Sequence, residues 1–259
     1  AASAPALYYA CSSHSGMGGA VNTNSLFGSS NFSGTIQSTL SANVDAGFSI
    51  IKHSGNATAN QTIGHGLSKA PDLTISKKRE DNGYIWSVYL PAILGDDHLR
   101  LDHQGAKGNE WEAHEAVTAS TIQLSDATNS SFNQVNKNVI TYAFHSVDGY
   151  CKVGSYKGNG NVNGTFVYTG FRVAFVMRKR TDDTTHWHIN DSARIGFNGP
   201  TSNLSLRPNV SDDEDDADRI DLLSNGFKVR TTSGDANNNN SLFIYIAFAE
   251  TPFKYSNAR

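Results

Sequence analysis

The sequence predicts an all-β fold with little helix, arranged as two tandem β-sandwich units of the lectin or jelly-roll kind that are related by internal duplication. Three observations predict it. Short segments such as 72–79 and 84–90 alternate between apolar and polar residues and are bounded by Gly, Asn and Asp clusters, which is the pattern of half-buried strands and turns. Long stretches with the 3.6-residue period of a helix are missing. The order of these strand-like and turn-like segments also repeats after roughly 100 residues.

Residues 1–46 are predicted to form an N-terminal arm or linker. Positions 1–44 hold no Asp, Glu, Lys or Arg and are rich in Ser, Gly, Ala and Asn. Such a segment is a flexible linker when it is exposed and alone. Its aromatic residues favour an arm that packs on a neighbour.

Residues 47–148 and 149–259 are predicted to be the two sandwich repeats. Six sequence blocks recur in the same order with shifts of 101 to 104 residues. The shift is 101 at Ile75 and at Trp86, which matches Trp187. We therefore expect both tryptophans to be buried at equivalent positions. One larger sandwich formed by both halves together is the alternative architecture.

The last strand of each repeat is apolar on both faces. These strands are expected at 139–144 and 243–248. A strand of this kind belongs in the middle of a sheet that is covered on both sides. Between the strands of the first repeat, a Glu-rich insertion at 108–118 predicts one or two short helices.

Composition and charge exclude several functional classes. The net charge is −3 and the isoelectric point is about 6.3, so the sequence lacks the clustered basic face of a nucleic-acid-binding protein. No run approaches the roughly 18 consecutive apolar residues of a membrane span, which argues against membrane insertion. Cys11 and Cys151 are too few and too far apart to form a disulfide framework.

Several segments of the second repeat resemble a known family. They include Gly149-Tyr-Cys-Lys-Val-Gly-Ser-Tyr-Lys-Gly-Asn-Gly, Leu223-Ser-Asn-Gly-Phe-Lys-Val-Arg and the closing Pro252-Phe-Lys-Tyr-Ser-Asn-Ala-Arg. They are similar to the C-terminal domain of tail-fibre-like structural proteins of marine tailed bacteriophages. The resemblance covers residues 47–259 and implies a structural protein of the virion. It carries no catalytic motif over to this chain.

The insertion of the first repeat holds the candidate ligand-binding residues. Trp111 has His103 and His114 near it in the sequence. An aromatic face can stack on a sugar ring, and the loops of a rigid sandwich usually carry binding sites. The alternative is that Trp111 plugs the end of the sandwich.

The candidate metal ligands lie in an acidic run of the second repeat. Asp212, Asp213, Asp215 and Asp216 offer carboxylates that bind calcium when their oxygens converge. The run lacks the ordered spacing of a known calcium loop, so a solvated acidic loop is the favoured interpretation and no cofactor is required. His186 and His188 have the i, i+2 spacing of a zinc pair. The favoured interpretation there is that both imidazoles face solvent while Trp187 packs inward.

No nucleophile elbow and no metalloprotease motif occurs in the sequence, which favours a protein that is not an enzyme. The first hypothesis is a tail-fibre or host-attachment module that binds a cell-surface glycan or receptor. The second is a capsid decoration or head-fibre protein with a purely structural role. The third is a glycan depolymerase in which Glu110 and Glu112 act as the carboxylates.

The expected location for the first two hypotheses is the virion, an extracellular particle. The expected partners are other virion proteins and further copies of the chain in a homo-oligomer. A host-surface glycan is the expected ligand of the first hypothesis.

Overall fold

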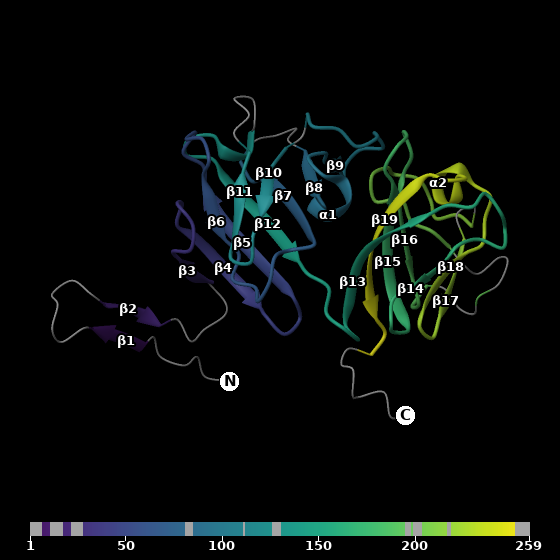
Figure 1. The fold of residues 1–259 in the computed structure, drawn as a ribbon, viewed down its shortest axis with the longest axis horizontal. Coiled ribbons are helices and arrows are strands. Elements are labelled where there is room, and N and C mark those ends of the chain that lie inside the picture. The colour runs from purple at the N-terminus through teal and green to yellow at the C-terminus, as the bar shows by residue number, and fades with distance from the viewer. Residues whose placement is uncertain are drawn as a thin grey trace.

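The computed structural model describes residues 7–10, 18–21, 28–80, 85–110, 112–125, 131–194, 198, 204–216 and 219–251. Almost all of its regular structure is β-strand, in antiparallel sheets that form two sandwiches lying side by side (Figure 1). The all-β class with little helix is therefore confirmed. None of the helices in this described part is long and apolar enough to cross a membrane.

Sandwich 1 comprises residues 28–144 and pairs a seven-stranded sheet with a three-stranded sheet. Its elements are β3 (Ser29–Asn31), β4 (Ser38–Asn43), β5 (Phe48–Ser54), β6 (Thr62–Gly64), β7 (Leu73–Lys78), β8 (Trp86–Tyr89), α1 (Pro91–Leu94), β9 (Leu99–Arg100), β10 (His114–Val117), β11 (Thr121–Leu124), η1 (Ser131–Asn133) and β12 (Asn138–Phe144). The first large sheet has the order β3-β4-β5-β12-β7-β8-β9, and the first small sheet has the order β10-β11-β6. A separate hairpin of β1 (Leu7–Ala10) and β2 (Gly18–Val21) precedes them.

Sandwich 2 comprises residues 151–249 and pairs a four-stranded sheet with a three-stranded sheet. Its elements are β13 (Cys151–Lys157), β14 (Phe166–Tyr168), β15 (Val173–Arg180), β16 (Trp187–Asp191), β17 (Ile220–Leu223), β18 (Gly226–Val229), α2 (Gly234–Asn237) and β19 (Leu242–Ala249). The second large sheet has the order β13-β19-β15-β16, and the second small sheet has the order β14-β18-β17.

The two sandwiches share one strand order. The run β5-β12-β7-β8 corresponds to β13-β19-β15-β16, and β10-β11-β6 corresponds to β17-β18-β14. Lys77 lies opposite Trp86 across one ladder, and Lys179 lies opposite Trp187 across the other. By strand pairing, Lys77 therefore corresponds to Lys179. The sequence alignment with its shift of 101 residues instead matches Lys77 to Arg178, so the two alignments differ here by one residue. Common descent of the two sandwiches stays a prediction.

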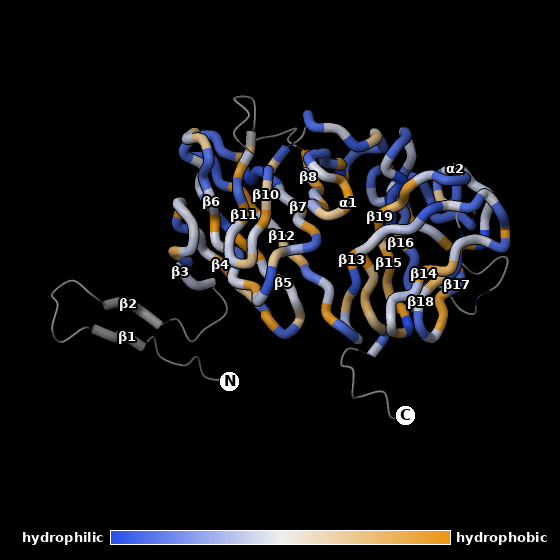
Figure 2. The backbone as a smooth tube through the Cα atoms, viewed as in Figure 1, coloured by the Kyte–Doolittle hydropathy of each residue, from blue (hydrophilic) through white to orange (hydrophobic). Residues whose placement is uncertain are grey.

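The central position of the two last strands is confirmed. β12 lies between β5 and β7, and β19 lies between β13 and β15. The inner face of β19 contributes Phe243 and Ala247 to the apolar core of sandwich 2. Its outer face contributes Ile244 and Ile246 to a second cluster. Figure 2 shows hydrophobic and hydrophilic positions following one another along the strands of both sandwiches.

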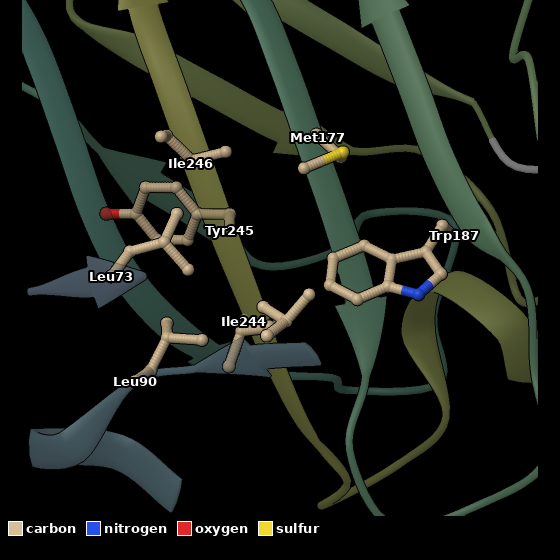
Figure 3. A pocket seen from close by; sticks show the side chains of 8 residues that line it. Leu73, Leu90, Met177, Trp187, Ile244, Tyr245 and Ile246 are labelled. Atoms are coloured by element: carbon tan, nitrogen blue, oxygen red, sulfur yellow. The ribbon is translucent and has the colours of Figure 1, made fainter. Parts of the chain in front are cut away.

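The second cluster joins the two sandwiches. The outer faces of the two large sheets pack against each other, so that Leu73, Val88 and Leu90 of sandwich 1 meet Met177 and Trp187 of sandwich 2. Figure 3 shows Leu73, Leu90, Met177 and Trp187 around a small space between the sandwiches. That cavity has a volume of about 10 Å³, which is roughly the space of one water molecule. The side chains around this cavity are therefore in close contact.

The insertion of sandwich 1 also contacts sandwich 2. The backbone N–H of Lys107 donates to the carbonyl of Thr181 at 2.8 Å, and the N–H of Thr185 donates to the carbonyl of Gln104 at 2.8 Å. These bonds hold residues 104–107 against the loop between β15 and β16. The loop is thus part of the inter-sandwich contact.

Three expectations from the sequence need correction. The sheet of sandwich 1 begins at Ser29, because β3 and β4 pair in series onto β5 although their residues were assigned to the arm. Residues 114–117 form β10 and not a short helix, because their partner β11 supplies a ladder that outweighs the helix preference of Glu and Ala. Trp187 is buried as expected, whereas Trp86 is only partly buried.

Candidate functional site

A row of partly buried aromatic rings lies on the outer face of the first large sheet. The rings of Phe48 and Tyr142 are stacked, with centroids 6.4 Å apart and planes within 2° of parallel. The rings of Tyr142 and Trp86 follow at 6.3 Å and 23°. Phe144 contacts Phe48 at 4.7 Å. We call these four residues the aromatic row.

The alternation of side chains along each strand produces this row. Phe48 and Ile50 on β5 point to the same face because they are two positions apart. Tyr142 on β12 is the cross-strand partner of Ile50. The intervening positions on β5, Ser49 and Ile51, are buried toward the small sheet. The large sheet therefore has apolar side chains on both faces. On the outer face Trp86, Tyr142 and Phe144 pack against the cluster between the two sandwiches, and the ring of Phe144 lies 6.3 Å from that of Phe248 in sandwich 2.

An open groove of about 390 Å³ extends the aromatic row at the β4–β5 hairpin. Its lining residues are Ser41, Ala42, Asn43, Val44, Asp45, Phe48 and Ile50. The groove thus combines a ring and an aliphatic side chain with a hydroxyl, an amide and a carboxylate. Asn43 is held in place because its Oδ1 accepts the backbone N–H of Ala46 at 3.0 Å.

The charges near the row are of both signs. The ammonium of Lys77 lies 5.7 Å from the centre of the Trp86 ring, which is within the range of a cation–π contact. Lys52 on β5 and Asp45 in the hairpin are exposed. Flat apolar rings flanked by hydroxyl, amide and charged groups suit a ligand with one apolar face and many hydroxyls. A sugar chain is such a ligand.

The candidate ligand residues predicted from the sequence do not come together. Trp111 lies outside the described residues. His103 is exposed, and its Nδ1 accepts the N–H of Gly105 at 2.9 Å. His114 is 1% exposed on β10, inside sandwich 1. The expectation of an exposed loop site is therefore wrong for His114.

His114 belongs to a polar network inside sandwich 1. Its Nδ1 lies 2.9 Å from the hydroxyl of Thr74, and its Nε2 lies 3.4 Å from that of Ser76. Ser76 in turn contacts the hydroxyl of Thr141 at 2.8 Å. Burial lowers the pKa of His114 well below its usual value, so the imidazole is neutral. All four side chains are almost inaccessible to water, and the network stabilises the fold without meeting a ligand.

Arginines neutralise part of the acidic run. Arg207 lies 2.7 Å from Asp215 and 3.5 Å from Asp212, and Arg194 lies 2.8 Å from Glu214.

Asp213 and Asp216 are exposed. No group of three or more His, Cys, Asp or Glu side chains in the described part of the chain is arranged to hold a metal ion. The structure thus places Asp212 and Asp215 beside Arg207 and leaves Asp213 and Asp216 exposed.

The expectation that His188 faces solvent is wrong. His188 is fully buried inside sandwich 2, where its Nδ1 lies 3.2 Å from the hydroxyl of Ser205. Burial, and then the positive charges of Arg178 and Arg207, lower its pKa well below the usual value. Only the neighbouring His186 is partly exposed, and its Nδ1 lies 3.1 Å from the amide of Asn209. The two imidazoles serve different environments and do not form a zinc pair.

The aromatic row was not predicted from the sequence. A signal for it exists in β5, where Phe48 and Ile50 are apolar on one face while Ile51 is apolar on the other. Of the two carboxylates suggested for glycan cleavage, Glu110 is exposed. Glu112 accepts a hydrogen bond from the hydroxyl of Ser125 at 3.1 Å.

Comparison with known protein families gives a match over most of the chain. Residues 22–252, which include both sandwiches, match the family described as a domain of unknown function (DUF7483). No curated protein and no solved structure matches the chain. Because the match covers far more than half of its length, the chain belongs to the DUF7483 family.

Proposed function

We propose that this chain is a glycan-binding attachment module of a bacteriophage particle, of the tail-fibre kind, that binds without catalysis. The observation that carries the proposal is the aromatic row with the adjoining groove at the β4–β5 hairpin. The similarity of residues 47–259 to tail-fibre-like proteins supports the assignment to a virion. The proposed ligand is a cell-surface polysaccharide of the host.

Binding would use the two kinds of chemistry present at the site. The apolar face of a sugar ring would lie against Phe48 or Trp86, where contact removes apolar surface from water. Sugar hydroxyls would exchange hydrogen bonds with Ser41, Asn43 and Asp45. Since these side chains sit on strands and a tight hairpin, the ligand orders few protein groups when it binds.

Retention on immobilised polysaccharides tests the proposal. Phe48→Ala and Trp86→Ala should each weaken retention about tenfold or more, because aromatic side chains commonly dominate such contacts. Phe32→Ala is the matched control, since Phe32 is 75% exposed but does not line the groove. Equal retention of all three variants and the unmodified chain would refute the site.

A purely structural role, as a capsid decoration or head-fibre protein, is the second candidate. It is favoured by residues 1–44, which carry no charged side chain and suit burial on a neighbouring subunit. Light scattering on the purified chain, with and without calcium, separates the two. A stable trimer supports a fibre, and a monomer supports a decoration protein whose arm docks on another virion protein.

A further inference from the structure

One side of sandwich 1 is closed by a segment that comes before its first repeated strand. Residues 28–43 supply β4, which pairs along β5 from Thr39 opposite Lys52 to Asn43 opposite Phe48. The same segment reaches the small sheet, where the N–H groups of Thr35 and Ile36 donate to the carbonyl of Thr62 at 3.0 Å. The segment therefore makes hydrogen bonds to both sheets, to β5 in the large one and to β6 in the small one.

The segment also seals the core. The partly buried side chains of Ile36 and Leu40 pack against the aliphatic cluster of sandwich 1 that contains Ile63 and Leu67. Like the rest of positions 1–44, it carries no charge. An uncharged strand with two aliphatic side chains is thus what completes this side of the sandwich.

Sandwich 2 has no such segment among its described residues, so β13 is an edge strand. The short linker before it covers only its start, where Val147 bridges Cys151 and the hydroxyl of Ser146 accepts the N–H of Val153. Since alternate residues of a strand direct their backbone groups to the same edge, Ser155 directs its N–H and C=O outward. The counterpart of that edge in sandwich 1 is the β5 edge that β4 occupies.

The second small sheet is open on the same side. β14 pairs only with β18 in the described structure. The carbonyl of Thr165 accepts from Val229, and the N–H of Thr169 donates to Asn225, so the backbone groups of Phe166 and Tyr168 point to the free edge. The side chains of Phe166 and Tyr168 are 43% and 59% exposed. An edge strand with exposed aromatic residues is a template for another strand.

We propose that the β13–β14 edge of sandwich 2 is the docking site for the hairpin β1–β2 of a second copy of this chain. The added strand would complete sandwich 2 in the way that residues 28–43 complete sandwich 1. The contact is head-to-tail, because the hairpin of one copy meets a different surface on the next.

Three features of the molecule favour this occupant. β1 and β2 are strands that pair with each other and with no other described strand. Their segment carries no charge, so its burial does not remove an ion from water. Figure 1 shows the hairpin on the side of sandwich 1 that faces away from its own sandwich 2, which favours a partner chain over the same chain.

The first test is the mass of the full chain over a range of concentrations. The unmodified chain should self-associate, and Phe166→Lys should raise the dissociation constant about tenfold or more, because a lysine on an edge strand opposes strand addition. Val135→Lys is the matched control, since it adds the same charge at a valine that is 55% exposed on sandwich 1. A monomeric unmodified chain, or equal association of both variants, would overturn the proposal.

The second test does not depend on the lysine variant folding well. Cys11 directly follows β1 in the sequence. In Tyr168→Cys, mild oxidation should join Cys11 of one copy to residue 168 of another and give disulfide-linked multimers on a non-reducing gel. Adding Cys11→Ser should abolish them. A disulfide that forms within one chain would overturn the assignment to a second copy. Glycan retention is a separate readout, so the two proposals can fail independently.

Discussion

At the scale of single residues, Trp187 joins the two sandwiches by both packing and hydrogen bonding. Its ring is 2% exposed, and its Nε1–H donates to the carbonyl of Arg100 at 2.7 Å. Trp187→Ala should therefore reduce the free energy of unfolding by roughly 3–5 kcal/mol, mainly because it leaves a cavity. Urea unfolding followed by circular dichroism measures this loss.

Trp86→Ala is the control for that substitution. Trp86 occupies the corresponding ladder position but is only partly buried, so its loss should cost clearly less stability. The same substitution should weaken glycan retention, which Trp187→Ala should leave intact if it folds. Equal losses of stability would contradict the difference in burial.

Five buried histidines have pKa values below that of a free imidazole and make stability depend on pH: His53, His65, His98, His114 and His188. Burial lowers the pKa of His53 and of His98 to about 4, and those of His114 and His188 also lie well below 6.5. The unfolded chain, with pKa values near 6.5, binds protons between about pH 6.5 and 4 that the folded chain does not. The free energy of unfolding should thus be largest above this window and fall as pH falls through it.

His98→Phe isolates one of these groups. The ring of His98 stacks on Tyr89 with centroids 4.4 Å apart, and phenylalanine keeps the stacking without titrating. Denaturant unfolding at several pH values should show a shallower loss of stability for this variant, by up to roughly 3 kcal/mol at pH 4. His103→Phe changes an exposed histidine and should keep the original slope. Identical slopes for both variants would refute the role of His98.

At the scale of elements, the segment that closes sandwich 1 depends on Gly34. Its φ of +98° is in the region that favours glycine, and a Cβ there would lie 2.6 Å from the carbonyl oxygen of Thr62. Gly34→Ala should destabilise the protein by about 1–3 kcal/mol. It should also speed amide hydrogen exchange in residues 28–43 and in β6, while exchange in sandwich 2 stays unchanged. Uniform acceleration across both sandwiches would contradict a local effect.

The strands themselves were predictable from the sequence, because period-two alternation and turn residues are local signals. The doubly covered positions of β12 and β19 followed from strands that are apolar on both faces. The membership of β3 and β4 was not predictable, since their residues are small and polar and are ordered by a ladder with β5. β10 was missed for the same reason, because its pairing with β11 is a contact between elements.

The candidate site could not be predicted from residues that are close together in the sequence. His103 and His114 are close in sequence, but the chain passes from an exposed loop into the interior between them. Phe48, Tyr142 and Trp86 are far apart in sequence and meet only because β5, β12 and β8 belong to one sheet. A site made by sheet assembly leaves no spacing motif in the sequence.

At the scale of the whole molecule, we expect the cluster shared by the two sandwiches to make them unfold together. Val88 is 1% exposed in the cluster between the large sheets. Calorimetry should show one cooperative transition for the unmodified chain, and Val88→Asp should separate it into two, because an unpaired carboxylate is costly to bury. Val135→Asp, at an exposed valine, should keep one transition. Two transitions in the unmodified chain would show that the interface is too weak to couple them.

Common descent of the sandwiches makes a geometric prediction at the same scale. Superposition of β5, β12, β7 and β8 on β13, β19, β15 and β16 should align all four strands with Trp86 on Trp187. A least-squares fit of the Cα atoms of these eight strands provides the comparison. A best fit that reorders the strands or reverses their directions would rule the duplication out.

The positions at which the chain enters and leaves each repeat have a consequence for rearrangement of the gene. The first and last repeated strands of each unit are paired end to end, with Phe48 opposite Phe144 and Cys151 opposite Phe248. Sandwich 2 can therefore be permuted or inserted elsewhere with only a few linking residues, since its two ends already lie side by side, whereas sandwich 1 begins two strands earlier at β3. The linker between the sandwiches is correspondingly short, at residues 145–150. A chain with this connectivity can gain or lose sandwich 2 without breaking a ladder of sandwich 1.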